Sequence, residues 1–536
     1  MKSVSLKAIS PYRKATKYAL AAILAFDLSQ ALALPSDPRS GQAPDPEAVV
    51  PEYLRKGLET DLEQMVSTYA NSNHSPVQTL YRIPVKITFS SDGRTINVDL
   101  GREVGLQANR GSVEEMTQMI LNDIRYRLRE YKVEGFNFIY AGKDFYDIFP
   151  EERPKPVAHD KKNSTGPVVV SASHGLYHHK KHGWVFQRPI TNGIQEDLLT
   201  PGYASELRDL ISVRSNFPTA TARPLRDGTH DGSGKPWSDM SAREHLKSLY
   251  PDAGETLWAT MEDRKPDDVE YDDDIRSRPK YSNLIGARAS INIHTNASQS
   301  ESSRGTYVYI AKESDNEMAE SILCYMGEKI HAQVGYKDFY VAQAATMKNH
   351  GENRLADAPS VIVETAFHTN PKDAEALQDP IFRAAAMKGV EKGYRLFAEG
   401  KPCLSFNLER IDNKSLGTGQ TVTVEAEYKG YPDLPMKLDV KVRDCPKGWT
   451  CTGGTRVIRE LGASPLRFDV SCRAPESGSV DFETSLTDVD GVTTDRVQHY
   501  VDCSVPYDER DPTVHGVIEM VPESDFPSPP EPTIET

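Results

Sequence analysis

Apolar and polar positions follow three different patterns along the chain, and the first pattern covers residues 51–155. A helical spacing of apolar residues over 51–70 precedes β-rich runs at 85–89, 95–100 and 136–140. Asp92-Gly93 between the first two runs predicts a β-hairpin. Ser112 begins a Ser-Val-Glu-Glu capping pattern, which predicts a helix from there to about Tyr131. We therefore expect a small α+β domain at 51–155. It holds no cluster of catalytic residue types, so we interpret it as a binding or scaffolding domain.

The second pattern consists of short apolar runs separated by helical segments. The runs at 168–172, 289–293 and 360–364 are rich in β-branched residues, as in parallel strands buried on both faces. Helical patterns lie at about 196–212, 315–332 and 371–398. This alternation predicts a central α/β domain at 165–400, with a mostly parallel sheet flanked by helices.

A long polar insertion at 217–285 interrupts the central pattern. Its acidic run comprises Asp267, Asp268, Glu270, Asp272, Asp273 and Asp274. We interpret this run as a solvated loop, and the alternative is a segment that covers a site.

The third pattern begins at Cys403, where helical signals stop. Apolar and polar residues alternate at 421–428, 437–442, 466–470 and 480–484, with turn residues between them. This pattern predicts an all-β, immunoglobulin-like sandwich domain at 403–505. The tail at 506–536 is rich in Pro, Glu and Asp and is predicted to be disordered.

The first 33 residues resemble a secretory signal peptide. A basic start is followed by a short apolar core and by Ala31-Leu32-Ala33, a small-x-small cleavage pattern. Cleavage is predicted after Ala33, with a linker at 34–50. A buried or membrane-anchoring helix is the alternative, but Asp27 would interrupt the span of about 20 residues that crossing a bilayer requires.

Composition and charge exclude several classes of protein. The 536 residues carry a formal net charge of −15 and are 38% hydrophobic, which excludes a multi-span membrane protein and a wholly disordered chain. The acidic balance argues against a nucleic-acid partner. No later stretch is long enough for a stable membrane span.

The six cysteines support export. Five lie in the last quarter of the chain and lack the paired spacing of a zinc ribbon, so disulfides are expected. Cys445 can pair with Cys451 and Cys472 with Cys503, which leaves Cys403 to reach Cys324. Connectivity itself cannot be determined from the sequence.

Metal-binding and acid–base residues follow the three central strands. His174 follows the first, His294 the second, and Glu364 ends the third, while Glu196 opens the helix after the first strand. Carboxyl ends of parallel strands are where sites form in such sheets. Two imidazoles and one carboxylate suit a catalytic Zn²⁺, so His174, Glu196 and His294 are the expected ligands and Glu364 the general base. His178, His179 and His182 are competing ligand candidates.

These residues stand in motifs that resemble the zinc-dependent N-acetylmuramoyl-L-alanine amidases of bacterial cell walls. The resemblance runs from about Val168 to Phe397. The matching elements are Ser173-His174-Gly175, Gly193-Ile-Gln-Glu196, Asn292-Ile-His294-Thr-Asn-Ala297 and Val363-Glu364-Thr-Ala-Phe-His-Thr-Asn-Pro371.

The resemblance implies a hydrolase that cleaves the amide between N-acetylmuramic acid and L-alanine in peptidoglycan. The signal peptide and the cysteines predict that it acts in the periplasm or after secretion. The resemblance also implies Zn²⁺ on the three ligands, and Glu364 as base and then acid. The N- and C-terminal domains are candidate binding sites for glycan or for an envelope activator protein. The alternatives are a non-catalytic peptidoglycan-binding or regulatory protein on the same scaffold, and a zinc peptidase that acts on the stem peptide.

Two features depart from the family pattern. Ser171 and Ser173 replace the acidic residue and the glycine usually found before the first histidine. Some family members carry an autoinhibitory helix between the third ligand and the catalytic glutamate, whereas the long insertion here precedes His294. That insertion is expected either to cover the zinc cleft or to form a wall of the substrate groove.

Overall fold

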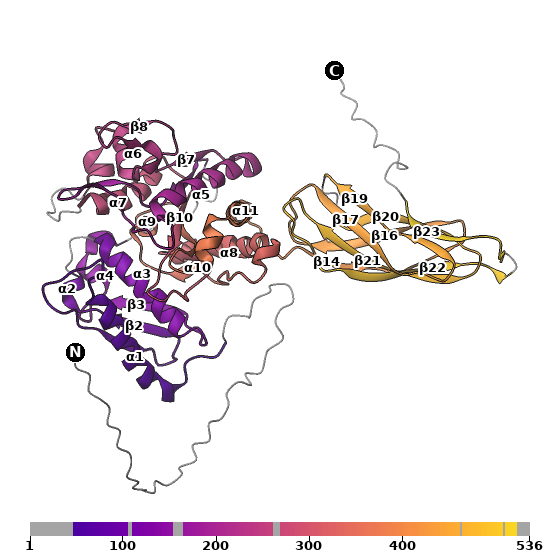
Figure 1. Ribbon diagram of the computed structural model, residues 1–536, viewed down its shortest axis with the longest axis horizontal. Helices are drawn as coiled ribbons and strands as arrows, with labels where there is room; N and C mark the ends of the chain where they lie inside the picture. Colours follow the sequence, from indigo (N-terminus) through magenta and orange to yellow (C-terminus); the bar gives the residue numbers. More distant parts are fainter. Residues whose placement is uncertain are drawn as a thin grey trace, which may run out of the picture.

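The chain folds into three parts that follow one another along the sequence (Figure 1). The computed structural model describes residues 47–105, 110–153, 165–260, 269–460, 464–507 and 510–521. The predicted signal peptide, most of the predicted linker and residues 522–536 lie outside the described residues.

The N-terminal module contains one three-stranded sheet with helices around it. Its strands have the order β1-β2-β3, with β1 and β2 antiparallel and β2 and β3 parallel, which confirms the predicted hairpin. Its elements are α1 (Glu52–Ala70), β1 (Lys86–Phe89), β2 (Thr95–Asp99), α2 (Gly101–Gly105), α3 (Arg110–Arg127), β3 (Gly135–Ile139) and α4 (Phe145–Ile148).

The predicted start of α3 is wrong, because Ser112 lies inside the helix and does not cap it. The carboxylate of Asp272 instead accepts hydrogen bonds from the backbone N–H groups of Arg110 (3.0 Å) and Gly111 (2.7 Å). A side chain some 160 positions away thus satisfies N–H groups that a helix start leaves unpaired.

The central domain contains a six-stranded sheet of order β12-β11-β13-β10-β4-β7. The strands β13, β10, β4 and β7 are parallel, and β11 runs antiparallel to β13, so the predicted mostly parallel sheet is confirmed. The strands are β4 (Val168–Ala172), β7 (Thr219–Thr221), β10 (Ala289–Asn296), β11 (Tyr307–Ile310), β12 (Thr346–Met347) and β13 (Ser360–Phe367). Two short hairpins lie outside this sheet, β5 (Tyr177–His179) with β6 (Gly183–Val185) and β8 (Thr229–His230) with β9 (Lys235–Pro236).

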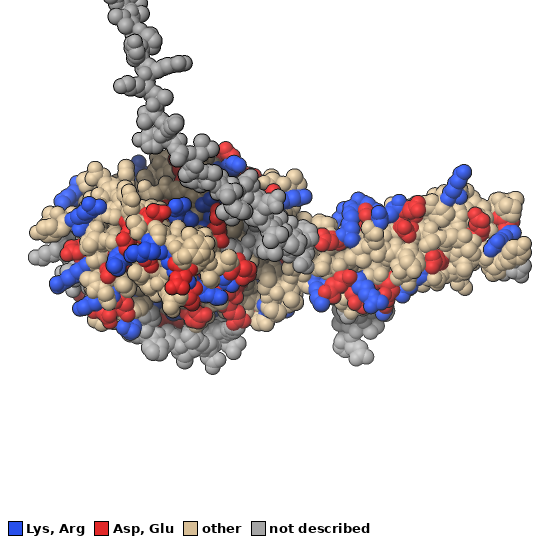
Figure 2. Space-filling view, turned by 90° about the horizontal axis from the view of Figure 1, so that it is seen from below, with Lys and Arg blue, Asp and Glu red and all other residues tan. Residues whose placement is uncertain are grey.

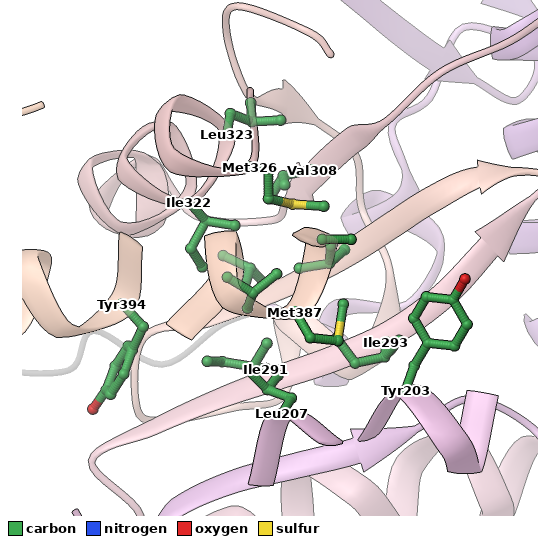
Figure 3. Packing of buried hydrophobic residues seen from close by; sticks show 14 of the residues in the cluster. Tyr203, Leu207, Ile291, Ile293, Val308, Ile322, Leu323, Met326, Met387 and Tyr394 are labelled. Atoms are coloured by element: carbon green, nitrogen blue, oxygen red, sulfur yellow. The ribbon is translucent and has the colours of Figure 1, made fainter. Parts of the chain in front are cut away.

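Helices cover both faces of the central sheet. One face packs against α5 (Glu196–Leu210), α8 (Asn316–His331), α10 (Pro371–Gln378) and α11 (Pro380–Ala398). Figure 3 shows this core, where Ile291 and Ile293 of β10 meet Leu207 of α5, Ile322 of α8 and Met387 of α11. The single helix predicted at 371–398 is two helices, because Asp379 caps the second one and Pro380 begins it.

The opposite face packs against α6 (Ala242–Leu249), α7 (Val269–Leu284) and α3 of the N-terminal module, and α9 (Gly351–Arg354) lies beside α7. Leu121 of α3 forms a buried apolar cluster with Tyr309 of β11 and Ile362 of β13. The N-terminal module is thus joined to the central domain by a shared core.

The insertion at 217–285 is part of this architecture. It supplies the edge strand β7 and the helices α6 and α7. The solvated-loop interpretation is wrong for Asp272, Asp273 and Asp274, which lie on α7 and are buried, whereas Glu270 on the same helix is half-buried. Asp267 and Asp268 lie outside the described residues.

The C-terminal part contains two five-stranded sheets that share one hydrophobic core. Their orders are β14-β16-β20-β23-β18 and β15-β22-β21-β17-β19. The strands are β14 (Asn407–Ile411), β15 (Lys414–Gly417), β16 (Thr421–Lys429), β17 (Met436–Asp444), β18 (Trp449–Thr452), β19 (Gly454–Ile458), β20 (Leu466–Arg473), β21 (Gly478–Thr487), β22 (Val497–Ser504) and β23 (Gly516–Met520).

The predicted disordered tail at 506–536 needs a correction, because β23 lies within it. This strand pairs with β18 and β20, and Ile518 is buried in the shared core. Its apolar residues, Val517, Ile518 and Met520, are too few to stand out within an acidic, proline-rich segment.

All three predicted disulfides are present, Cys324–Cys403, Cys445–Cys451 and Cys472–Cys503. The first links α8 of the central domain to the segment that leads into the C-terminal sheets. The described residues include no helix with both the length and the apolar character needed to cross a membrane. On the face shown in Figure 2, acidic and basic side chains are interspersed over the rounded body and the elongated C-terminal sheets.

A buried ion network joins α8 to the C-terminal sheets. The ammonium group of Lys329 contacts the carboxylates of Asp433 (2.7 Å), Asp488 (2.8 Å) and Asp490 (3.1 Å), and its side chain is fully buried. Arg214 and Lys388 also pair with Asp490. The three carboxylates could suit a metal by proximity, but these cations already neutralise them.

We expect Lys329→Met to lower the free energy of unfolding by about 3–5 kcal/mol, the usual cost of removing one partner of a buried ion pair. Thermal and urea unfolding would measure the change. Lys401→Met is the matched control, since its exposed pair with Glu399 should contribute about 1 kcal/mol or less. Equal effects of the two variants would contradict a structural role for the network.

Candidate metal centre and catalytic cleft

The central sheet brings the four predicted site residues to one edge. His294 of β10 and Glu364 of β13 are register partners on adjacent parallel strands. His174 follows β4, the other neighbour of β10, and Glu196 is the first residue of α5. All four side chains are buried.

The turn after β4 has an unusual backbone. His174 has a φ of 56° and Gly175 a φ of 122°. A Cβ atom on Gly175 would lie 2.8 Å from the backbone of Ser241, so only glycine fits beside His174. A non-glycine residue in the left-handed region is uncommon, and this conformation turns the His174 imidazole into the site.

Two imidazole nitrogens and one carboxylate oxygen converge. The Glu196 Oε1 atom lies 3.6 Å from His174 Nε2 and 3.5 Å from His294 Nδ1, and the three atoms all lie within 4.8 Å of one another. Oε1 also accepts hydrogen bonds from the Ser173 hydroxyl (3.0 Å) and the Thr295 backbone N–H (2.9 Å). Ser173, one of the two departures from the family pattern, therefore helps to hold Glu196.

The outer nitrogens of both imidazoles are already paired. His174 Nδ1 donates to Gln187 Oε1 (2.9 Å), and His294 Nε2 donates to Glu352 Oε2 (2.7 Å). These bonds fix each ring and leave His174 Nε2 and His294 Nδ1 for a cation, which is how proteins orient metal-binding histidines. The donor set of two nitrogens and one oxygen fits Zn²⁺ with an open fourth position.

The hydrogen bonds that support His174 and His294 both lead to the buried carboxylate of Asp274. Asp274 Oδ2 accepts from Gln187 Nε2 (2.8 Å) and from the Arg278 guanidinium, which in turn pairs with Glu352. Asp274 Oδ1 accepts from the Arg243 backbone N–H. Asp274 is thus connected to both imidazoles, from inside the insertion at 217–285.

Charge and burial set the protonation of these groups. Burial and the nearby Arg188 hold the pKa of His174 well below its ordinary value, which favours the neutral imidazole. Burial would lower the pKa of His294, but Glu352 and Glu196 outweigh it and raise that pKa to about 10. Burial would raise the pKa of Glu196, but His174 and His294 hold it well below its usual range.

The pKa of Glu364 is raised, whereas that of Glu196 is lowered. Burial raises the pKa of Glu364 to about 7, although His294 acts in the opposite direction. A carboxyl group with a pKa near neutrality can both accept and donate a proton at physiological pH.

A cavity of about 610 Å³ opens onto these residues. One wall comes from the N-terminal module, through Tyr69, His74, Gln118 and Met119, and another from Tyr271, Ile275 and Arg278 of α7. The cleft is therefore built from two parts of the chain, and α7 serves as one of its walls.

The structure brings together His174, Glu196, His294 and Glu364, as predicted. His178, His179 and His182 lie on or beside the β5–β6 hairpin and are not in the described cluster of potential ligands. Sequence reasoning missed several supporting residues, namely Gln118, Gln187, Asp274, Arg278 and Glu352. Each is an ordinary polar residue on a helix or loop, and no motif connects it to the site.

Comparison with known proteins agrees with this site. Residues 243–395 match the model of a family described as N-acetylmuramoyl-L-alanine amidase. This match includes His294 and Glu364, whereas His174 and Glu196 precede it. A relative named probable cell wall amidase LytH, from Staphylococcus saprophyticus, is 23% identical over 218 residues, which cover 41% of this chain and 68% of the relative. A LytH of Staphylococcus epidermidis is 24% identical over 126 residues, 23% of this chain and 40% of that relative.

Alignments with two solved structures each cover less than half of this chain. The catalytic domain of CwlV, an N-acetylmuramoyl-L-alanine amidase from Bacillus (Paenibacillus) polymyxa, aligns over 44% of this chain and 99% of that chain, with 15% identity and a TM-score of 0.30. The CwlD amidase from Clostridioides difficile, solved in complex with the GerS lipoprotein, aligns over 44% of this chain and 100% of that chain, with 15% identity and a TM-score of 0.30.

The family match and the relatives confirm the resemblance predicted from the motifs. The family match and the relatives support assignment to the hydrolases that act on linear amide bonds. Within that class, the central domain is similar to the N-acetylmuramoyl-L-alanine amidases.

We expect Asp274→Asn to weaken zinc binding by about 10–100-fold, the usual effect of removing a group that orients metal ligands. The amide cannot accept hydrogen bonds at both former oxygens, so the chain to one imidazole is weakened. Competition with a chelator of known affinity measures the change. Asp273→Asn, on the same helix but bonded to Thr260, is the matched control. Equal zinc affinity in both variants would show that Asp274 does not support the ligands.

Proposed function

We propose that this protein is a zinc-dependent N-acetylmuramoyl-L-alanine amidase. Its reaction is hydrolysis of the amide between N-acetylmuramic acid and L-alanine in peptidoglycan. The observation that carries the proposal is the convergence of His174 Nε2, Glu196 Oε1 and His294 Nδ1 beside the Glu364 carboxyl, within one cavity. The family match and the cell wall amidase relatives support the substrate class.

His174, Glu196 and His294 would hold the zinc ion. When bound, zinc polarises the scissile carbonyl and lowers the pKa of a coordinated water toward about 7. Glu364 would take one proton from the attacking water as the C–O bond forms. It would then give that proton to the departing L-alanine nitrogen as the C–N bond breaks, so the carboxylate is regenerated in each cycle.

The environment of Glu364 supports this assignment. Glu364 Oε1 accepts a hydrogen bond from Gln118 Nε2, whereas Oε2 is buried and has no hydrogen-bond partner among the described residues. A buried carboxylate oxygen that lacks a partner is costly, and a reacting water or substrate group would supply one.

We further propose that the protein acts outside the cytoplasm, in the periplasm or after secretion. The relatives are named as cell wall amidases, and the three disulfides fit an oxidising compartment. Cleavage of a signal peptide after Ala33 would accompany export. We also propose an envelope activator protein as a partner. The proposed domains are 51–155, 165–400 and a C-terminal domain that begins at 403 and includes β23, and so extends to about 520.

We expect Glu364→Gln to lower kcat by at least about 10²-fold while zinc stays near one ion per chain, because the amide cannot accept the proton of the water. His294→Ala should lose both zinc and turnover. Metal analysis and hydrolysis of purified muropeptides separate the two effects. Full turnover of Glu364→Gln would refute the base assignment.

Product analysis tests the bond that is cut. Mass spectrometry should find stem peptides with a free L-alanine amino group and glycans with a free lactyl carboxyl group. Cleavage inside the stem peptide would identify a peptidase instead, and binding without products would identify a non-catalytic protein.

The rate should depend on pH through Glu364. Its pKa is raised, so the protonated form accumulates as the pH falls through about 7, and that form cannot act as the base. Bound zinc lowers this pKa, so kcat should decline about tenfold per unit on the acid side of a midpoint at or below about 7. Zinc content measured at each pH is the control. A flat profile from pH 8 to 4 with zinc retained would contradict the role of Glu364.

A further inference from the structure

Helix α3 of the N-terminal module reaches the site of the central domain. Gln118 and Asn122 are four residues apart, so they project from the same face of the helix. Asn122 Nδ2 donates to Asn296 Oδ1 (2.7 Å) and to the Ala297 carbonyl (2.8 Å), and the Tyr309 hydroxyl donates to Asn122 Oδ1 (2.8 Å). These bonds tie α3 to the end of β10, two residues after His294.

Gln118 contacts the proposed base directly. Its Nε2 atom donates to Glu364 Oε1 (2.7 Å) and to Asn296 Oδ1 (3.0 Å), which uses both hydrogens of the amide. An ionised carboxylate only accepts hydrogen bonds, so the amide nitrogen must face Glu364. Asn296 in turn holds Gln118 in this orientation.

We propose that Gln118 is a positioning residue that the N-terminal module contributes to the catalytic cleft. By holding Glu364 Oε1, it fixes the rotation of the carboxylate and leaves Oε2 toward the reacting water. The inference rests on the proposed function, in which Glu364 is the general base. It assigns to the module at 51–155 a part in the reaction that its sequence does not suggest.

Buried contacts fix helix α3 on the central domain. Leu121 lies in a buried apolar cluster with Tyr309 and Ile362, and Asp272 of α7 caps the helix start. Glu114 pairs with Arg354. Burial would raise the pKa of Glu114, but Arg354 and His350 together lower it to about 2. A helix that left the cleft during turnover would expose this apolar surface and separate these buried charges. We therefore favour a fixed positioning role over a removable cover.

Gln118→Met tests the proposal, because methionine keeps the length of the side chain and removes the donor. We expect kcat to fall about 10–100-fold, the scale of a misplaced catalytic group, with KM within about twofold and zinc unchanged. Arg125→Met is the matched control on the same helix. It removes a hydrogen bond to Thr346 and the stacking on Tyr307 and Phe136 but no hydrogen bond to Glu364, so kcat should stay within about twofold.

A second variant, Gln118→Glu, keeps the proposal testable if methionine disturbs folding. Two adjacent carboxyl groups resist ionising together, so the acid limb of kcat should move to higher pH. An unmoved acid limb would show that residue 118 does not lie against Glu364 in the active enzyme and would overturn the proposal.

These experiments test the positioning role of Gln118 and the proposed amidase function separately. Unchanged kcat in Gln118→Met, or equal losses in Gln118→Met and Arg125→Met, would overturn the positioning role while an inactive Glu364→Gln upheld the proposed function. Increased kcat in Gln118→Met would also overturn it and would identify α3 as an inhibitory cover. Full activity of Glu364→Gln would instead refute the proposed function itself.

Discussion

Several carboxylates and two imidazoles are buried together at one edge of the central sheet, and the cost of burying charge constrains everything around them. An ionised group removed from water must gain charged or hydrogen-bonded partners, or it becomes neutral. Glu196 gains His294, the Ser173 hydroxyl and the Thr295 N–H, Glu352 gains Arg278 and His294, and Asp274 gains Gln187 and Arg278. Glu364 has the fewest partners, and its pKa is accordingly raised, toward the value that a general base requires.

This constraint explains why the site uses segments far apart in the sequence. The proposed metal ligands lie on β10, at the start of α5 and after β4, all in the central domain, whereas groups that support the site come from α7 and α3. The insertion at 217–285 supplies Asp274 and Arg278, and the N-terminal module supplies Gln118. The C-terminal sheets contribute nothing to the described cavity, and a separate ion network around Lys329 anchors them on the far end of α8.

Residues whose role follows from local pattern were predictable. The three buried strands, the histidines at the carboxyl ends of two of them and the glutamate at the start of α5 follow from hydrophobic runs and from the geometry of parallel sheets. The supporting residues were not predictable in this way. Among them, Asp272–Asp274 form an acidic run that is typical of solvated loops. Only the fold shows that Asp272 caps α3 and that Asp274 connects both imidazoles. Likewise, no sequence pattern links Gln118 to a carboxylate 246 positions later.

Zinc K-edge X-ray absorption of the metal-loaded protein tests the central claim most directly. The account predicts one zinc per chain, with two imidazole nitrogens and oxygen ligands at about 2.0–2.2 Å and no sulfur. His174→Ala should remove one imidazole contribution or the metal itself, whereas His178→Ala should leave the spectrum unchanged. A site with three imidazoles, or a spectrum that changes with His178 and not with His174, would contradict the ligand set on which the account depends.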